Sequence, residues 1–422
     1  MAVMTNPLVL IHTSVAFFPL FCIGYSGLIM RLNDGVHAFY INALLRALTM
    51  ALVSIFVPLF VYQQALRIWG TMQLGLLAVV SYYFLQRLIV LVMSIPISKI
   101  IERIGFRRSI AISIFLLILN MASLVLAKQY PILIVAATIF MGLNIPMYWV
   151  ARDSALSQDT PSRDMGKDMG GIAALEQIAA LSGPFVAGVI IERFGFSILF
   201  TVALVILVVS VIPLWWMPHH AHKNGVTLAG FFWWVTSRRY FHQSVALIGA
   251  SMQDYGLSVL WPLALFFAGI KIGALGIIFS AVMIVRVGFQ YGVGTWFDRM
   301  RKRGGVGDEI AYAFSTISSA LLWLVRLFVS GIWAVVLVDS ISQGFQSIYY
   351  GFQANYAHMG GKRMGSIAYW VYSQMIYSVA ALGLFAIMAI GVWYGVWKEL
   401  TFVTIALWVL ASIVQGRESS LK

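Results

Sequence analysis

Six ionisable residues stand inside long stretches of the sequence that carry almost no other charge. They are Arg46, Arg87, Glu176, Asp254, Arg286 and Asp339. Within a membrane span, such a group costs roughly 2.5–3.5 kcal/mol on insertion scales, so its presence indicates a function or a partner of opposite charge. Three of the six are positive and three are negative, so pairing among them could neutralise the whole set.

Polar residues around two of these groups repeat at helical spacing. The longer set follows the pattern i, i+3, i+4, i+7, i+8 and i+11, and comprises Asp339, Ser342, Gln343, Gln346, Ser347 and Tyr350. The second set comprises Ser251, Asp254, Tyr255 and Ser258. Each set occupies one helix face. Because a polar face does not contact lipid, we expect both to line a water-filled cavity. The alternative is hydrogen bonding between helices; for shorter sets around Arg46 and Asn144 both interpretations stay open.

Arg87 and Arg286 lie near the middle of two apolar stretches, and Gln290 follows Arg286 by one helical turn. Two guanidinium groups at this depth could hold an anion, or the anionic end of a zwitterion, from opposite sides. The alternative is that both arginines pair with the three carboxylates named above and stabilise one state of the protein.

Asp254 and Glu176 are the two candidates for coupling to a proton or cation. Asp254 lies deep in its stretch, and Glu176 lies nearer one end of its own. Carboxyl groups removed from water are the usual carriers of protons in membrane transport proteins. For Glu176, an ion pair with Arg152 or Lys167 is the competing interpretation.

The composition explains where these charges must sit. Of the 422 residues, 61% are hydrophobic and only 10% are charged, against roughly 25% charged residues in a typical soluble domain. This excludes a soluble globular protein and a disordered one, and indicates an all-α polytopic membrane protein. Twelve apolar runs follow, at 40–63, 72–97, 109–127, 131–151, 171–191, 196–217, 243–268, 272–296, 309–329, 332–353, 365–390 and 393–415. An earlier run, Leu8–Met30, either spans the membrane or lies at its surface.

The basic residues predict the orientation. Of the 28 Lys and Arg residues, 19 fall at the ends of the runs that share one side, and six, Arg326 among them, fall on the other. Positive loops face the cytoplasm, so we expect a multi-pass protein of the cytoplasmic (inner) membrane with both ends of the twelve-helix core inside. The net charge of +13 is therefore mostly loop charge, and a nucleic-acid partner is excluded.

Two internal matches indicate a duplicated architecture. Gly166–Ala173 and Gly361–Ala368 are identical at six of eight positions, at an offset of 195 residues, and the pairs Glu102-Arg103 and Asp298-Arg299 repeat at 196. We therefore predict two six-helix halves, 39–217 and 243–422, after an N-terminal segment 1–38 that is interfacial or an additional membrane helix. The linker 218–242 is either an interfacial amphipathic helix or an extension of the seventh membrane helix.

With these features the chain resembles the major facilitator superfamily. The loop Ser98–Arg108 is similar to that family's Gly-x-x-x-Asp-Arg-x-Gly-Arg-Arg signature, with Ser98 for Gly and Glu102 for Asp; Gly294, Asp298 and Arg299 form its degenerate repeat. The resemblance implies a central cavity lined by the first, fourth, seventh and tenth helices. It also implies conformational latches formed by Glu102, Arg103, Arg107, Asp298 and Arg299, whose alternative role is to set the topology.

Two further points concern helices five and four. Ser182–Gly188 resembles the Gly-Pro-x-x-Gly-Gly element of antiporter branches, with Ala187 in place of one Gly. The fourth helix carries Asn144 where proton-coupled exporters usually have an arginine, so proton antiport does not follow from the resemblance.

We therefore predict a secondary active transporter of a small anionic or amphiphilic solute, working by rocker-switch alternating access. The predicted substrate contacts are Arg46, Arg87, Asp254, Tyr255, Ser258, Arg286, Gln290, Asp339, Ser342, Gln343 and Gln346. The alternative is a non-transporting receptor, assembly factor or lipid-handling protein on the same scaffold. No metal-binding, nucleotide-binding or hydrolase motif occurs, so we expect a monomer with no cofactor, metal ion or enzymatic activity.

Overall fold

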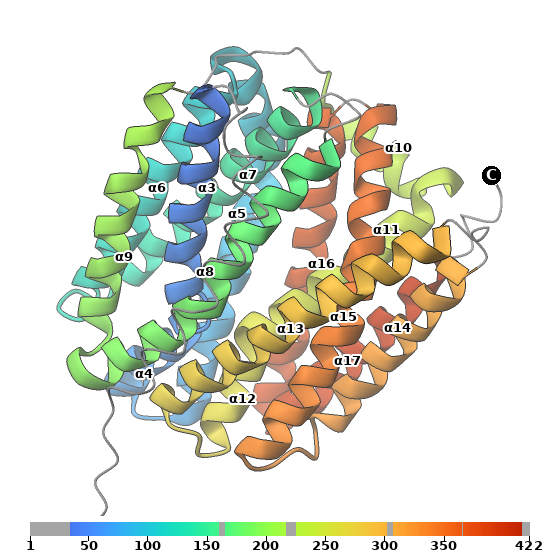
Figure 1. The fold of residues 1–422 in the computed structure, drawn as a ribbon. Coiled ribbons are helices and arrows are strands. Elements are labelled where there is room, and N and C mark those ends of the chain that lie inside the picture. The colour runs from blue at the N-terminus through green and yellow to red at the C-terminus, as the bar shows by residue number, and fades with distance from the viewer. Residues whose placement is uncertain (1–33, 160–164, 217–224, 302–306, 365, 416–422) are drawn as a thin grey trace, which may run out of the picture.

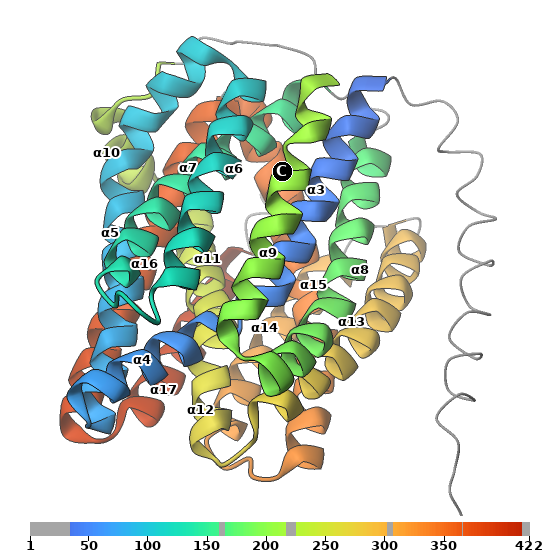
Figure 2. The same ribbon diagram turned by 90° about the vertical axis from the view of Figure 1, so that its left-hand side faces the viewer.

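The computed structural model describes residues 34–159, 165–216, 225–301, 307–364 and 366–415, and these ranges are helical with short turns. The helices stand side by side in two groups, one from each half of the chain (Figure 1; Figure 2). This confirms the all-α fold. The apolar run Leu8–Met30 lies outside the described residues.

The helices of the N-terminal half follow the predicted runs closely. They are α3 (Asp34–Val53), α4 (Val57–Trp69), α5 (Met72–Ile104), α6 (Phe106–Leu126), α7 (Leu133–Asp159), α8 (Met165–Phe194) and α9 (Phe196–Ser210), and the short 3-10 helix η1 (Ile212–Trp216) follows. Helices α5 and α6 meet at Gly105, whose φ of 81° is open to glycine but strained for other residues.

The C-terminal half follows a short linker helix. Its elements are α10 (Leu228–Thr236), α11 (Arg238–Tyr255), the π-helical turn η2 (Gly256–Leu260), α12 (Trp261–Phe267), α13 (Ile272–Arg301), α14 (Gly307–Val325), α15 (Ile332–Met364), α16 (Ser366–Tyr394) and α17 (Trp397–Ala411). The linker helix α10 is separated from α11 by Ser237, whose backbone is extended. It is amphipathic, since Phe231 and Trp234 are buried whereas Phe232 and Trp233 are exposed.

Seven helical segments in the described part are long and apolar enough to cross a membrane. They are Met72–Ile104, Phe106–Leu126, Leu133–Ala155, Phe196–Leu214, Ile272–Phe289, Ile367–Tyr394 and Trp397–Gln415. The pair Ile41–Val53 and Val57–Trp69, bent by 41°, makes an eighth candidate. The four other predicted runs, 171–191, 243–268, 309–329 and 332–353, are also helical.

The first helix of each half is broken at its middle. The break between α3 and α4 precedes Pro58, and the π-helical turn between α11 and α12 precedes Pro262. Proline lacks the amide hydrogen that a continuous helix requires, and π-turns recur at functional sites. Ser54 at the first break and Ser258 at the second both line the space between the halves.

The halves meet along α5 with α16 and along α8 with α13. The second contact is very close, because a methyl group built on Gly276 of α13 would lie 2.3 Å from the carbonyl oxygen of Pro184 in α8. A methyl group on Gly188 would lie 3.1 Å from the carbonyl oxygen of Gly273. The Gly-Pro element of α8 therefore serves as a surface on which α13 packs backbone against backbone.

Aromatic side chains join the halves at the end of the bundle formed by α4 and α12. The ring of Tyr62 lies 6.0 Å from that of Phe266 and 5.0 Å from that of Phe267, measured between centroids. In the predicted orientation this is the outer end. At the opposite end, Trp234 of α10 packs on Tyr369 and Tyr372 of α16.

The close contact between α8 and α13 gives a test. Gly276→Ala should destabilise the protein by about 1–3 kcal/mol, the usual cost of overpacking, because no flexible group can yield at the Pro184 carbonyl. Gly288→Ala, in the same helix with open space around it, is the matched control and should leave stability unchanged. Unfolding of the two variants in detergent measures the difference, and equal stability would contradict the close packing.

Candidate functional site

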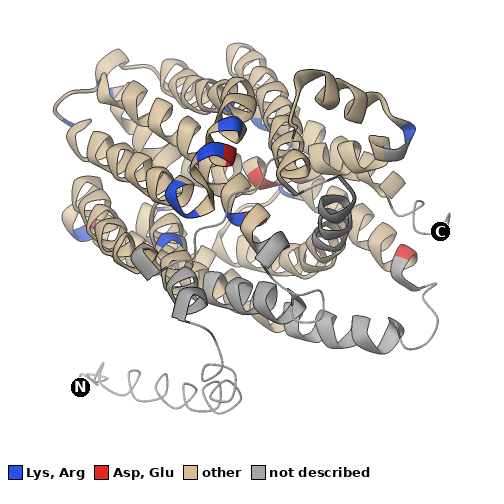
Figure 3. Cartoon of the chain, turned by 90° about the horizontal axis from the view of Figure 1, so that it is seen from above, with Lys and Arg blue, Asp and Glu red and all other residues tan. Residues whose placement is uncertain are grey.

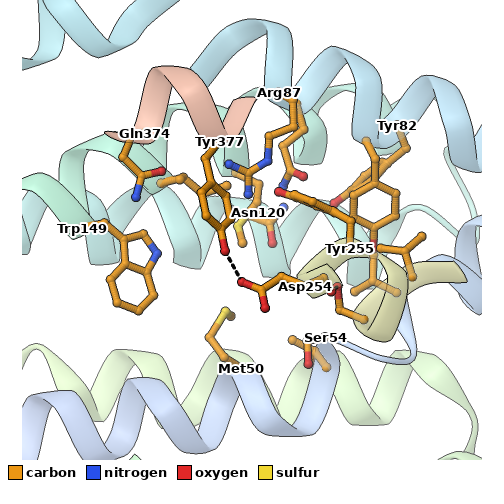
Figure 4. Close-up of a pocket in the computed structure, with 18 of the residues that line it drawn as sticks. Met50, Ser54, Tyr82, Arg87, Asn120, Trp149, Asp254, Tyr255, Gln374 and Tyr377 are labelled. Atoms are coloured by element: carbon orange, nitrogen blue, oxygen red, sulfur yellow. Dashed lines mark hydrogen bonds between the residues drawn. The ribbon is translucent and has the colours of Figure 1, made fainter. Parts of the chain in front are cut away.

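Side chains from both halves enclose a cavity of about 400 Å³ near the two helix breaks. The N-terminal half contributes α3, α5, α6 and α7, and the C-terminal half contributes α11, η2 and α16. Its polar and aromatic lining consists of Ser54, Tyr82, Tyr83, Gln86, Arg87, Asn120, Trp149, Asp254, Tyr255, Ser258, Gln374 and Tyr377 (Figure 4). The remaining lining is aliphatic or methionine. A cavity of this size and mixed character fits a small amphiphilic molecule.

Asp254 is the only carboxylate in the described lining of this cavity. It lies in the last turn of α11, and its oxygens accept hydrogen bonds from the phenol groups of Tyr350 in α15 and Tyr377 in α16. The charge of Asp254 also interacts with Arg87 of α5 and Arg286 of α13. Five helices thus meet around one carboxylate, whose position is held by two hydroxyl donors.

Arg87 reaches the cavity from the opposite half. Its guanidinium carbon lies 4.7 Å from the centroid of the Tyr255 ring, a cation–π contact. In the described part of the chain, its Nε and Nη1 atoms are buried without a hydrogen-bond partner, as is Nε of Arg286. Buried donors are normally paired, so these guanidinium groups have unused capacity for an acceptor.

Charged residues are few in the described part, and several Lys and Arg lie in the middle of the bundle rather than at its rim (Figure 3). Around Asp254 the charges do not cancel, because two arginines face one carboxylate. The described lining of the cavity itself carries one positive charge, on Arg87, and one negative charge, on Asp254; Arg286 adds positive charge near Asp254 from outside the lining, in surroundings where charge interactions are strong.

The structure brings together four of the predicted substrate contacts, namely Arg87, Asp254, Tyr255 and Ser258. Arg286 lies close enough to act on Asp254 without lining the cavity. Arg46 lies elsewhere, with its guanidinium carbon 3.4 Å from the centroid of Tyr148 and a hydrogen bond of 3.4 Å to Asn144. This favours the alternative interpretation of Arg46, contact between helices.

The polar face of α15 was expected to line the cavity, but none of its residues belongs to the cavity lining. Asp339 accepts hydrogen bonds from Arg326 at 2.8 and 3.1 Å and from the indole of Trp261 at 2.8 Å. Arg326 also donates to Ser342 at 2.9 Å, and Gln346 donates to the same hydroxyl at 3.0 Å. These residues bind their neighbours within the C-terminal half, Gln343 is buried beside them, and Tyr350 is the member of this face that reaches Asp254.

Arg326, counted above among the residues on the outer side, follows the last residue of α14 but does not point into solvent. Its exposed fraction is 0%, and its guanidinium carbon lies 4.6 Å from the ring of Trp323. Arg326 is the partner of Asp339, so the alternative in which Arg87 or Arg286 pairs with Asp339 does not hold in this structure. Short turns can direct a long arginine side chain back into the bundle, where the carboxylate compensates for lost hydration.

For several residues predicted to couple protons, bind substrate or form latches, the structure gives no side-chain contacts that decide the role. The side chains of Glu176, Gln290, Asp298 and Arg299 lie outside the described part. Glu102 and Arg107 are half-buried and both take part in interactions, whereas Arg103 is exposed. The latch role of these residues stays a prediction.

The predicted substrate contacts did not include eight polar or aromatic residues that line this cavity, namely Ser54, Tyr82, Tyr83, Gln86, Asn120, Trp149, Gln374 and Tyr377. Tyr377 and Gln374, one turn apart on α16, line the cavity, as does Trp149 of α7. The spacing of Gln374 and Tyr377 within an apolar helix is the signal that could have identified that pair.

The buried pair Arg326–Asp339 gives a second test. Removing one partner leaves the other charge buried, so Arg326→Met and Asp339→Leu should each cost about 3–5 kcal/mol. The double variant should cost clearly less than the sum, because no isolated charge remains. Arg108→Met, at an exposed basic residue, is the control for loss of a positive charge. Additive losses in unfolding experiments would exclude the pairing.

A family model described as Major Facilitator Superfamily matches residues 39–384. No curated protein matches the chain. Among solved structures, the fucose:proton symporter FucP of E. coli is 14% identical with a TM-score of 0.63, and covers 92% of this chain and 99% of its own.

A second solved structure agrees. The human organic anion transporter MFSD10 (TETRAN) is 10% identical with a TM-score of 0.67, and covers 91% of this chain and 99% of its own. At these identities the two structures show a shared fold over nearly the full length of each protein.

Proposed function

The chain belongs to the major facilitator superfamily, and from this membership and the cavity we propose that it transports a small anionic or amphiphilic solute by alternating access. The observation that carries the proposal is the cavity of about 400 Å³ lined by both halves, with Arg87 on one side and Asp254 on the other. A binding site divided between two rigid halves can face either side of the membrane as they rock.

The balance of charge supports an anionic substrate. Two arginines act on a single carboxylate at this site, so an anion completes the balance whereas a cation worsens it. The aromatic and methionine side chains of the lining, among them Met50, Met121 and Met141, provide apolar contact for the rest of the molecule. MFSD10, which shares the fold, is described as an organic anion transporter.

The helix breaks supply places for movement. Ser54 lies at the break between α3 and α4, and Ser258 lies in the π-helical turn before α12; both line the cavity. Contacts of α4 with Phe266 and Phe267 of α12 close one end. Separation of these aromatic rings would open that end, and hinge positions that absorb backbone changes lie next to the substrate.

Asp254 is our leading candidate for proton coupling, with Glu176 as the second. Protonation would cancel the negative charge that faces Arg87 and Arg286 and would raise the excess positive charge by one. An anion would then bind more tightly, so proton and anion would travel together. FucP, with the same fold, is described as a proton symporter.

Cysteine accessibility tests the alternating cavity. In a Cys22→Ala background, Ser54→Cys and Ser258→Cys should react with a membrane-impermeant thiol reagent from both sides of sealed vesicles, with a ratio that shifts under a proton gradient. Thr236→Cys, at the exposed end of α10, is the control and should react from one side at all times. Reactivity of the two cavity positions from a single side under every condition would exclude rocking.

Asp254→Asn tests the coupling proposal. The variant keeps the shape of the side chain but no longer titrates, so proton-driven uptake of an organic anion into proteoliposomes should be lost. Binding of the anion should persist and become independent of pH. Arg87→Gln should weaken binding about tenfold or more, since a charged hydrogen bond contributes about 1.5–3 kcal/mol. Proton-driven uptake that survives in D254N would exclude Asp254 as the coupling residue.

A further inference from the structure

A second cavity lies between the halves at the end of the bundle where α4 and α12 meet. It measures about 460 Å³. The N-terminal half contributes the end of α4, the α6–α7 turn and the α8–α9 turn, and the C-terminal half contributes the α12–α13 turn (Figure 2). In the predicted orientation it faces the outside of the cell. None of its lining residues belongs to the central cavity.

The charges that line this cavity are mostly positive. Arg67, Lys128 and Lys271 face a single carboxylate, Glu192. In the described part of the chain, none of the three cations makes an ion pair or hydrogen bond, and each is exposed. The site therefore holds two excess positive charges brought together from three separate turns.

Glu192 packs across the contact between the halves. A methyl group on Gly273 would lie 2.3 Å from its Oε2 atom, so the carboxylate rests against the first turn of α13. That turn carries the positive end of the helix dipole. Glu192 therefore offsets at most one of the three positive charges, and the other two are available to another anion.

A glutamine also lines this cavity beside the surface charges. Gln64 has an exposed fraction of 6% over the whole residue. Its amide atoms are not among the buried atoms that lack a hydrogen-bond partner, so they are accessible from the cavity. Gln64 therefore offers donors and an acceptor to a molecule inside the cavity.

The apolar part of the wall narrows the class of ligand. Phe60, Phe194 and Phe196 line the cavity beside the cations. Aromatic walls with several positive charges fit a flat organic molecule that carries one or two oxyanion groups. An inorganic ion would leave most of the space and the aromatic surface unused.

We propose that this outer cavity is a second binding site, specific for small organic anions with carboxylate or sulfonate groups. Lys271 belongs to the C-terminal half and the other two cations to the N-terminal half. Rocking that opens the outer end would separate them and dismantle the site. A bound anion therefore stabilises the state in which the outer end is closed, as any ligand stabilises the state that it binds best.

Binding experiments test the site without requiring transport. The protein in phosphatidylcholine nanodiscs is titrated with phthalate, benzoate and benzamide at low ionic strength. Phthalate should bind more tightly than benzoate, and neutral benzamide should not bind; high salt should weaken both anions. Equal affinity for benzamide would overturn the proposal.

Matched variants locate the site. Lys271→Gln and Arg67→Gln should each weaken phthalate about threefold to tenfold, as expected for partly screened charge pairs. Arg193→Gln, an exposed neighbour outside the lining, should change the affinity by less than about twofold. An equal effect of Arg193→Gln would overturn the proposal in favour of general surface charge.

Two further arms separate the possible origins of the signal. Arg87→Gln should leave phthalate binding at the outer cavity intact; loss of binding in that variant would assign the anion to the central cavity and overturn the proposal. In nanodiscs with phosphatidylglycerol, phthalate should still bind in a Lys271-dependent manner. If only the anionic lipid stabilises the protein through Lys271, the site holds a lipid headgroup and the proposal fails.

Discussion

The position of one carboxylate in a low-dielectric interior governs the arrangement of the central cavity. Asp254 is held by the hydroxyl groups of Tyr350 and Tyr377 and faces two guanidinium groups. Without such partners, the free energy needed to bury this charge would strongly destabilise the folded protein. Helices α5, α11, α13, α15 and α16 must therefore stay in register with one another wherever the charge remains. Any movement of the halves changes the distance between Asp254 and Arg87, so movement and charge are linked.

Close backbone packing makes that register possible. Helices α8 and α13 approach until the Pro184 carbonyl and Gly276 touch, which leaves no side chain to act as a spacer. On the other side, α5 and α16 pack through larger groups, such as the stacked rings of Tyr83 and Phe385 at 5.4 Å. Under the proposed alternating access, the halves would tilt around the close contact of α8 and α13, and the breaks at Pro58 and Pro262 would be the places that bend.

The architecture could be predicted because its signals are local and repeated. Apolar runs, basic loops and the match of Gly166–Ala173 with Gly361–Ala368 identified a duplicated helical protein, and the spacing around Asp254 identified a polar helix face. The pairing of charges could not be predicted, because it depends on which helices touch. Arg326 and Asp339 are 13 residues apart on successive helices, and their pairing needs the turn between α14 and α15 to direct Arg326 inward. The same limit applies to Tyr377, whose role depends on α16 lying against α11.

Two cavities at different depths between the same halves have a common physical consequence. The outer cavity has more positive than negative charge in its described lining, at the central cavity Arg87 and Arg286 both act on the single carboxylate of Asp254, and each cavity is divided between the halves. An anion in either site adds attraction across the contact surface, so anion binding and the closeness of the halves reinforce each other. At the outer cavity the charges are screened by water and salt. An anion should therefore bind there weakly and dissociate readily. At the central cavity the charges are buried, which suits selection, because a ligand of the wrong charge pays the full cost of an uncompensated site.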